Sequence, residues 1–224
     1  MKKLCFYNQK GGVGKTTISL LIANLFTKNN KKVCIVENSS GEKSISYIRE
    51  DILDRFSLSK KNFPDIKTLE SYSEYKEKEE EYKDYDIIIF DIDTSMSIEI
   101  TSDFVINSNY VFLLSNAESA EDYKIDQVFY TKFLNPLSFE EELDIIKTYT
   151  IFYKCNTELD LSTLPNLESL DVLEFKIPTM KKYEDLSSVL IMSDIETNTI
   201  NLFSKIESII YAEENISVDV DETE

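Results

Sequence analysis

The clearest chemistry in this sequence lies in a glycine-rich run near the N-terminus, Asn-Gln-Lys-Gly-Gly-Val-Gly-Lys-Thr-Thr at residues 8–17. Its glycines let the backbone bend tightly and turn successive N–H groups towards one point, where an anion is held. Lys15 adds a cation that suits the β- and γ-phosphates of a nucleotide, and the Thr16 hydroxyl suits Mg²⁺. The pattern therefore predicts a phosphate-binding loop made by Gly11, Gly12, Val13, Gly14, Lys15, Thr16 and Thr17.

The sequences on either side of this run predict the elements that such a loop needs. Residues 4–7, Leu-Cys-Phe-Tyr, form an apolar run that suits a buried parallel strand. After the loop, Ile18, Leu21, Ile22 and Leu25 recur with the i, i+3, i+4, i+7 spacing of a helix. A helix that begins at the loop turns its N-terminal amides and the positive end of its dipole towards the bound anion.

A second element of the candidate site is an aspartate at the end of another apolar run, Asp-Ile-Ile-Ile-Phe-Asp at residues 86–91. Asp91 would close a buried strand, which is the position of a Walker B carboxylate that orients Mg²⁺. An acidic residue that merely ends a strand is the alternative interpretation. The phosphate-binding loop at residues 8–17 favours the metal site, because the two motifs support each other.

One departure from the general phosphate-binding loop makes the pattern more specific. Gln9 stands in place of the first glycine, and Lys10 adds a second lysine before the double glycine. The run Gln-Lys-Gly-Gly-Val-Gly-Lys-Thr-Thr closely resembles the deviant P-loop of the ParA/MinD family. The resemblance implies ATP and Mg²⁺ as cofactors and a nucleotide sandwich dimer, in which Lys10 acts across the interface on the partner's phosphates. The alternative for Lys10 is a solvated lysine on a basic loop.

The segment after the second predicted strand differs from the family pattern. The family usually continues Asp-x-Asp-Pro-Gln, whereas residues 37–41 are Glu-Asn-Ser-Ser-Gly. Glu37 matches the first carboxylate, and Ser39 replaces the second, which the resemblance links to activation of the attacking water. Because serine is no base at neutral pH, we expect slow hydrolysis. Asp93 either supplies the missing carboxylate or caps a helix that begins near Ser97.

Apolar runs alternate with helical patterns along the rest of the chain. They predict one α/β domain over residues 1–211, with a mostly parallel twisted sheet, helices on both faces and right-handed crossovers, as in a P-loop NTPase. Further strands are expected at 32–36, 109–114, 151–153 and 173–178, and a closing helix near 202–210. After the strand at 151–153, Asn156 is either an adenine contact, as the resemblance implies, or an ordinary turn residue.

Composition restricts the chemistry and the partners. The 224 residues carry a net charge of −18, and residues 212–224 form an acidic tail that we expect to be disordered. The acidic block at 70–86, interleaved with tyrosines, predicts a charged helix face that covers the sheet. Three cysteines without paired spacing and the lack of histidine argue against zinc clusters and exclude histidine catalysis. Cys5 and Cys34 are interpreted as small buried hydrophobic residues.

The same features shape the functional hypotheses. An acidic chain repels phosphate, so nonspecific DNA binding has weak support, with Lys181 and Lys182 as the possible contacts. The chain has no basic amphipathic C-terminal helix for a membrane and no secretory signal, so we expect a cytoplasmic protein. The first hypothesis is a ParA-like ATPase for plasmid or chromosome partition or cargo positioning, with an activating partner protein. The alternative is a nucleotide-binding dimeric scaffold or regulator with little turnover.

Overall fold

The computed structural model describes residues 1–38, 45–57, 59, 62–93, 97–117, 119–126, 128, 132, 147–153, 171–177, 189, 195 and 197–216. Within these residues, seven strands form one sheet in the order β3-β2-β4-β1-β5-β6-β7, and each pair of neighbouring strands is parallel. The strands are β1 (Lys2–Tyr7), β2 (Val33–Glu37), β3 (Asp65–Thr68), β4 (Ile87–Asp91), β5 (Tyr110–Ser115), β6 (Lys147–Tyr153) and β7 (Asp171–Ile177). The predicted α/β class is confirmed.

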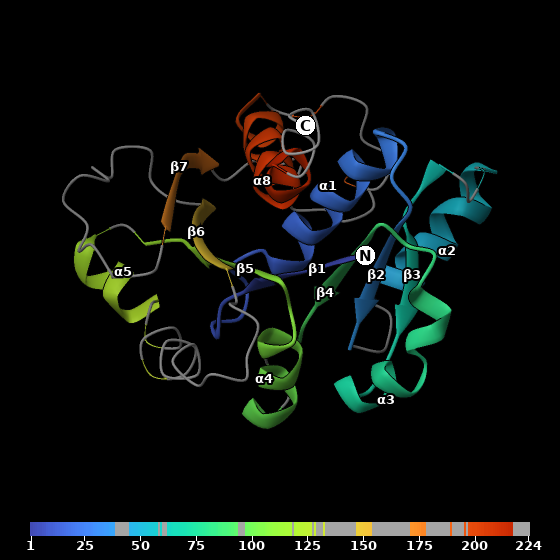
Figure 1. The fold of residues 1–224 in the computed structure, drawn as a ribbon, viewed down its shortest axis with the longest axis horizontal. Coiled ribbons are helices and arrows are strands. Elements are labelled where there is room, and N and C mark those ends of the chain that lie inside the picture. Colours follow the sequence, from blue (N-terminus) through green and yellow to red (C-terminus); the bar gives the residue numbers. More distant parts are fainter. Residues whose placement is uncertain are drawn as a thin grey trace, which may run out of the picture.

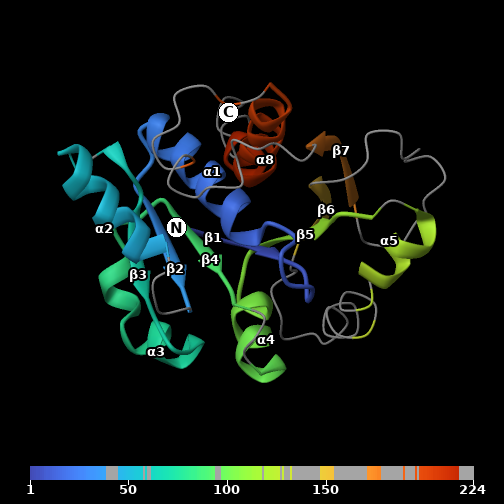
Figure 2. The same ribbon diagram turned by 180° about the vertical axis from the view of Figure 1, so that it is seen from behind.

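Helices cover both faces of this sheet (Figures 1 and 2), with α1 and α8 on one face and α3 and α4 on the other. The helical elements are α1 (Lys15–Lys28), α2 (Ile45–Phe56), α3 (Tyr72–Glu77), the 3-10 turn η2 (Glu79–Tyr82), α4 (Ile98–Ile106), α5 (Ala120–Asp126) and α8 (Thr197–Ile216). Side chains that alternate along β1 enter the two layers of the core. Leu4 and Phe6 pack in the layer of α1 and α8, whereas Cys5 and Tyr7 pack in that of α3 and α4. Burial on both faces explains the continuous apolar runs.

The two cysteines expected in the core are buried there. Cys5 and Cys34 are both free thiols without exposure to solvent. Burial raises the pKa of the Cys34 thiol to about 12, so it stays protonated at neutral pH. Their interpretation as small hydrophobic residues is confirmed, while Cys155 lies outside the described residues.

The acidic block at 70–86 folds as α3 and η2. Tyr72, Tyr75 and Tyr82 are buried against the sheet, and the ring of Tyr75 meets that of Phe90 edge-on at 5.3 Å between centroids. Carboxylates such as Glu80 on the outer side of the block remain exposed to solvent. The predicted charged face over the sheet is therefore confirmed, and its tyrosines are part of the core.

The C-terminal helix closes the layer that contains α1. Its apolar stripe is buried as predicted, with Leu202, Phe203, Ile206 and Ile210 in the core. The helix continues to Ile216, so residues 212–216 of the predicted tail are helical, and residues 217–224 lie outside the described part. None of the helices in the described ranges combines the length and apolar composition that crossing a membrane requires.

Candidate functional site

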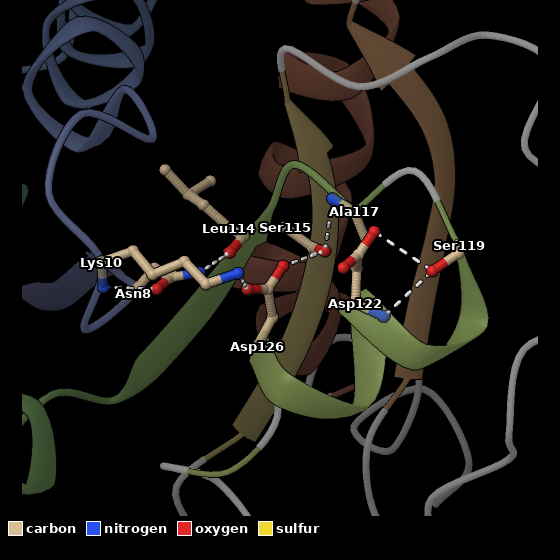
Figure 3. A network of polar contacts seen from close by, with 8 residues as sticks. All are labelled: Asn8, Lys10, Leu114, Ser115, Ala117, Ser119, Asp122 and Asp126. Carbon is tan, nitrogen blue, oxygen red and sulfur yellow. Dashed lines mark hydrogen bonds and ion pairs between the residues drawn. The ribbon is translucent and has the colours of Figure 1, made fainter.

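The glycine-rich loop leaves the sheet where the order of the strands changes direction. β1 lies between β4 and β5, and the loop runs from its carboxyl end at Tyr7 to the first residue of α1, Lys15. Such switch points are where open parallel sheets bind ligands. Asn8 anchors the loop, because its Nδ2 donates to the carbonyl of Leu114 at 2.7 Å and its Oδ1 accepts from the Lys10 N–H at 2.7 Å (Figure 3).

The glycines give this loop its shape and leave space over it. Gly12 and Gly14 have φ angles of 75° and 100°, in the left-handed region that only glycine adopts without strain. A Cβ built on Gly11 or Gly12 would meet no atom within 4 Å, so their side of the loop is open. Gly14 is the N-cap of α1 and makes no side-chain capping bond, so the first-turn amides of the helix are offered to an anion.

Lys15 lies inside the loop rather than in solvent. It is 9% exposed, and its Nζ donates to the carbonyls of Asn8 at 3.2 Å and Lys10 at 3.1 Å. Burial lowers the pKa of Lys15, and the negative charges of Asp91 and Asp93 act in the opposite direction. The cation is thus held at the loop by carbonyls and carboxylates, close to where phosphates would enter.

Asp91 faces the loop from the end of β4. Burial raises the pKa of its carboxyl to about 6, whereas hydrogen bonding from Thr16 lowers it. Its Oδ1 is buried without a hydrogen-bond partner among the described residues. An orphaned carboxylate oxygen beside the Thr16 hydroxyl fits the oxygen ligands that Mg²⁺ prefers. The predicted metal ligands Thr16 and Asp91 are therefore brought together, although the metal itself stays a prediction.

Glu37 is buried at the end of β2, opposite Asp91 in the strand register, but its carboxylate is engaged elsewhere. Its oxygens accept hydrogen bonds from the backbone N–H of Ile45 at 2.8 Å and of Ser46 at 3.1 Å, at the start of α2. They also accept from the Ser46 hydroxyl and from the Thr68 hydroxyl, the latter at 3.1 Å. In this arrangement Glu37 caps α2 and ties it to β3, and its catalytic role remains a prediction.

The side chain of Lys10 extends from the loop to α5 (Figure 3). Its Nζ forms an ion pair with Asp126 at the end of α5, whose side chain is 0% exposed and also accepts from Ser115 Oγ at 2.6 Å (Figure 3). The side chain of Lys10 itself is 45% exposed. A pocket of ≈ 270 Å³ adjoins this pair and is lined by Asn8, Gln9, Lys10, Ile125, Asp126 and Val128.

Of the remaining predicted site residues, some are described by the structure and others are not. Val13 and Thr17 are buried, Val13 in the core beneath the loop and Thr17 in the first turn of α1. Ser39 and Asn156 lie outside the described residues. Two residues at this edge are absent from the predicted set, Asn38 after β2 and Asp126 after β5. Neither belongs to a recognisable pattern, because an asparagine after a strand and an aspartate in a helix are both common.

Comparisons with known proteins agree with this fold. The family model described as "AAA domain" matches residues 1–51, which hold the loop and the first two strands. The MinC:MinD cell division protein complex of Aquifex aeolicus has a chain that is 18% identical, with 93% of this chain and 96% of that chain covered and a TM-score of 0.64. No curated protein matches the sequence.

Two further solved structures share the fold. A putative plasmid partition protein from Borrelia burgdorferi bound to AMPPNP is 18% identical, with 95% of this chain and 98% of that chain covered and a TM-score of 0.59. Cobyrinic acid a,c-diamide synthase from Mycobacterium smegmatis, with bound ATP analogue and magnesium, is 14% identical, with 94% of each chain covered and a TM-score of 0.60. The resemblance predicted from the P-loop is confirmed by the N-terminal match and by the fold.

Proposed function

We propose that this chain, which has the fold of MinD and of plasmid partition proteins, is an ATPase of the ParA/MinD type that binds ATP with Mg²⁺. The observation that carries the proposal is the loop between β1 and α1, where buried Lys15 and the uncapped start of α1 face the orphaned oxygen of Asp91. These are a cation, backbone donors and a metal ligand at one edge of the sheet. Two similar structures, one bound to AMPPNP and one to an ATP analogue with magnesium, support the same cofactors.

The proposal assigns a binding role to each part of the loop. The amides of residues 11–17 and the Lys15 ammonium hold the phosphates, while Thr16 and Asp91 hold Mg²⁺, which neutralises charge on the transferred phosphoryl group. Binding must first free the Lys15 ammonium from the carbonyls of Asn8 and Lys10, which accept from it in this structure. We therefore expect the loop to open slightly when phosphate replaces these carbonyls.

The test of nucleotide binding is the substitution Lys15→Ala, measured by calorimetry with ATP and Mg²⁺. Loss of the only ammonium buried within the described part of the loop should abolish measurable binding, while a matched Lys28→Ala at the other end of α1 should bind as the unaltered chain does. A Lys15→Ala protein that binds ATP with unchanged affinity would remove the proposal.

We further propose that the ATP form pairs with a second copy through the face that carries Lys10. The support is the position of Lys10 at the loop and the exposed apolar residues Ile125 and Val128 beside it, which are 58% and 39% exposed. Cargo positioning or partition with an activating protein partner then follows from the family resemblance, and the MinD chain that resembles this one is described in complex with MinC. Light scattering with and without an ATP analogue tests the pairing.

The second candidate function is a nucleotide-binding scaffold with little turnover. The capping role of Glu37 favours it, because this carboxylate is bound by the start of α2 and Ser39 is no base. Two measurements distinguish the ATPase from the scaffold: the rate of phosphate release and the nucleotide that remains bound after purification. Retained ATP without phosphate release would favour the scaffold.

A further inference from the structure

This chain lacks the second carboxylate that the family pattern has after β2, at the edge of the sheet beside the phosphate loop. Ser39 replaces the acid that the resemblance links to the attacking water, and the Glu37 carboxylate accepts the hydrogen bonds that begin α2. Asp91 is committed to the metal in the proposed function. In the described residues that directly follow these two strands, 38 after β2 and 92–93 after β4, Asp93 is the acidic residue.

Asp93 is held in place through its backbone. It lies two residues beyond the end of β4, is exposed, and its N–H donates to Oδ1 of Asn38 at 2.6 Å. Asn38 follows β2, is 7% exposed, and its own N–H donates to the carbonyl of Asp91 at 3.4 Å. These bonds tie the ends of β2 and β4 together, and the buried Asn38 side chain holds the backbone N–H of Asp93.

The charge of Asp93 is felt at the phosphate loop. It acts against the burial that lowers the pKa of Lys15, and only Asp91 has a larger effect in that direction. Asp93 follows β4, which neighbours β1 in the sheet, and lies two residues beyond Asp91, whose carboxyl accepts a hydrogen bond from Thr16. Asp93 therefore lies at the same edge of the sheet as the phosphate loop.

Asn38 offers a second sign that this edge is built to hold a ligand. Its Nδ2 is buried and finds no hydrogen-bond partner among the described residues. A buried amide donor left unpaired costs free energy, and a bound group that accepts from it repays that cost. The orphan donor and the exposed carboxylate belong to two residues joined by one hydrogen bond.

Resting on the proposed function, we propose that Asp93 is the carboxylate that orients the attacking water in this chain, and that Asn38 is its positioning residue. Asp93 accepts a hydrogen bond from the water and directs its lone pair to the γ-phosphorus. The water oxygen forms a bond to that phosphorus, and the bond from phosphorus to the bridging oxygen breaks, with its electrons staying on ADP. The proton lost by the water leaves with the released phosphate.

The test compares the steady-state ATPase kinetics of Asp93→Asn with those of Glu99→Gln. Glu99 is an exposed carboxylate in the first turn of α4, so its change to an amide is the matched control. We expect Asp93→Asn to lower kcat by about 10- to 100-fold with ATP affinity within twofold, since an oriented water is lost while the phosphate contacts remain. Glu99→Gln should leave both quantities unchanged.

The positioning role of Asn38 is tested by Asn38→Ala alone and combined with Asp93→Asn. We expect Asn38→Ala to lower kcat by about tenfold with KM unchanged, and the double variant to be no slower than Asp93→Asn, because both residues act through one carboxylate. Equal loss of nucleotide affinity and kcat in Asn38→Ala would instead indicate general damage to the loop and would overturn this role.

Three results would overturn the inference for Asp93 and leave nucleotide binding standing. One is an Asp93→Asn protein with unaltered kcat. Another is a kcat restored by high Mg²⁺, which would assign Asp93 to the metal. The third is an unaltered chain that binds ATP yet releases no phosphate. Failure of the unaltered chain to bind ATP would remove the proposed function itself.

Discussion

The burial of Asp91 lowers the stability of the nucleotide-free protein at neutral pH. Its carboxyl is buried at the end of β4, and that burial raises its pKa to about 6, from the ordinary value of 3.8. A carboxyl with a raised pKa in the folded state stabilises the fold below its unfolded pKa, and this contribution is lost as pH rises through 6. At neutral pH the nucleotide-free protein therefore carries an unfavourable buried charge that Mg²⁺ would neutralise.

The raised pKa of Asp91 predicts a pH dependence of the free energy of unfolding that is specific to this residue. The free energy of unfolding of the nucleotide-free chain, minus that of Asp91→Asn, should fall by about 1–1.5 kcal/mol between pH 5 and pH 8. Urea denaturation at several pH values measures both proteins, and the subtraction removes the other carboxylates. A difference that stays constant over this range would mean that Asp91 ionises as it does in the unfolded chain.

At the scale of elements, Glu37 joins three of them. From the end of β2 it accepts from the first two amides of α2 and from the Thr68 hydroxyl on β3. We predict that Glu37→Ala costs about 2–4 kcal/mol in the free energy of unfolding, because it leaves buried amides without an acceptor. Thr68→Val, which removes one donor and keeps a strand-forming residue, should cost about 1 kcal/mol.

Hydrogen exchange distinguishes this capping role from a catalytic one. Without the cap, the amides of Ile45 and Ser46 should exchange faster in Glu37→Ala, while those of α1 keep their protection. A Glu37→Ala protein that has full stability and unaltered exchange, but no hydrolysis, would contradict the capping role and return Glu37 to the catalytic set.

Elements whose residues are contiguous could be predicted from the sequence, whereas contacts between distant segments could not. β1, the loop and α1 were predictable because the strand, the glycines and the helical spacing are contiguous, and Asp91 ends an apolar run. β3 lacks such a run, since Asp65–Thr68 is a half-exposed strand at the edge of the sheet. The role of Glu37 depends on Ile45, Ser46 and Thr68, and no local pattern predicts that these segments meet.

At the scale of the whole molecule, the ion pair between Lys10 and Asp126 bears on assembly. In the single chain Lys10 is paired with a fully buried carboxylate, which Ser115 Oγ holds by a further hydrogen bond (Figure 3). If Lys10 is to reach the phosphates of a second copy, it must leave Asp126 without its cation. An unpaired buried charge is expensive, so this pair should oppose dimer formation.

We therefore predict that Asp126→Asn forms the ATP-dependent dimer at a protein concentration about 3- to 30-fold lower than the unaltered chain does. The amide can still accept the hydrogen bond from Ser115, and it leaves no unpaired buried charge when Lys10 moves away. Sedimentation with AMPPNP and Mg²⁺ measures the concentration at half-dimerisation. Asp122→Asn, on the same helix, is the control, since Asp122 accepts from Ser119 and not from Lys10. Lys10→Ala should remain monomeric. If Asp126→Asn and the unaltered chain dimerise at the same concentration, the ion pair imposes no cost, and Lys10 is free to move at any stage of the nucleotide cycle.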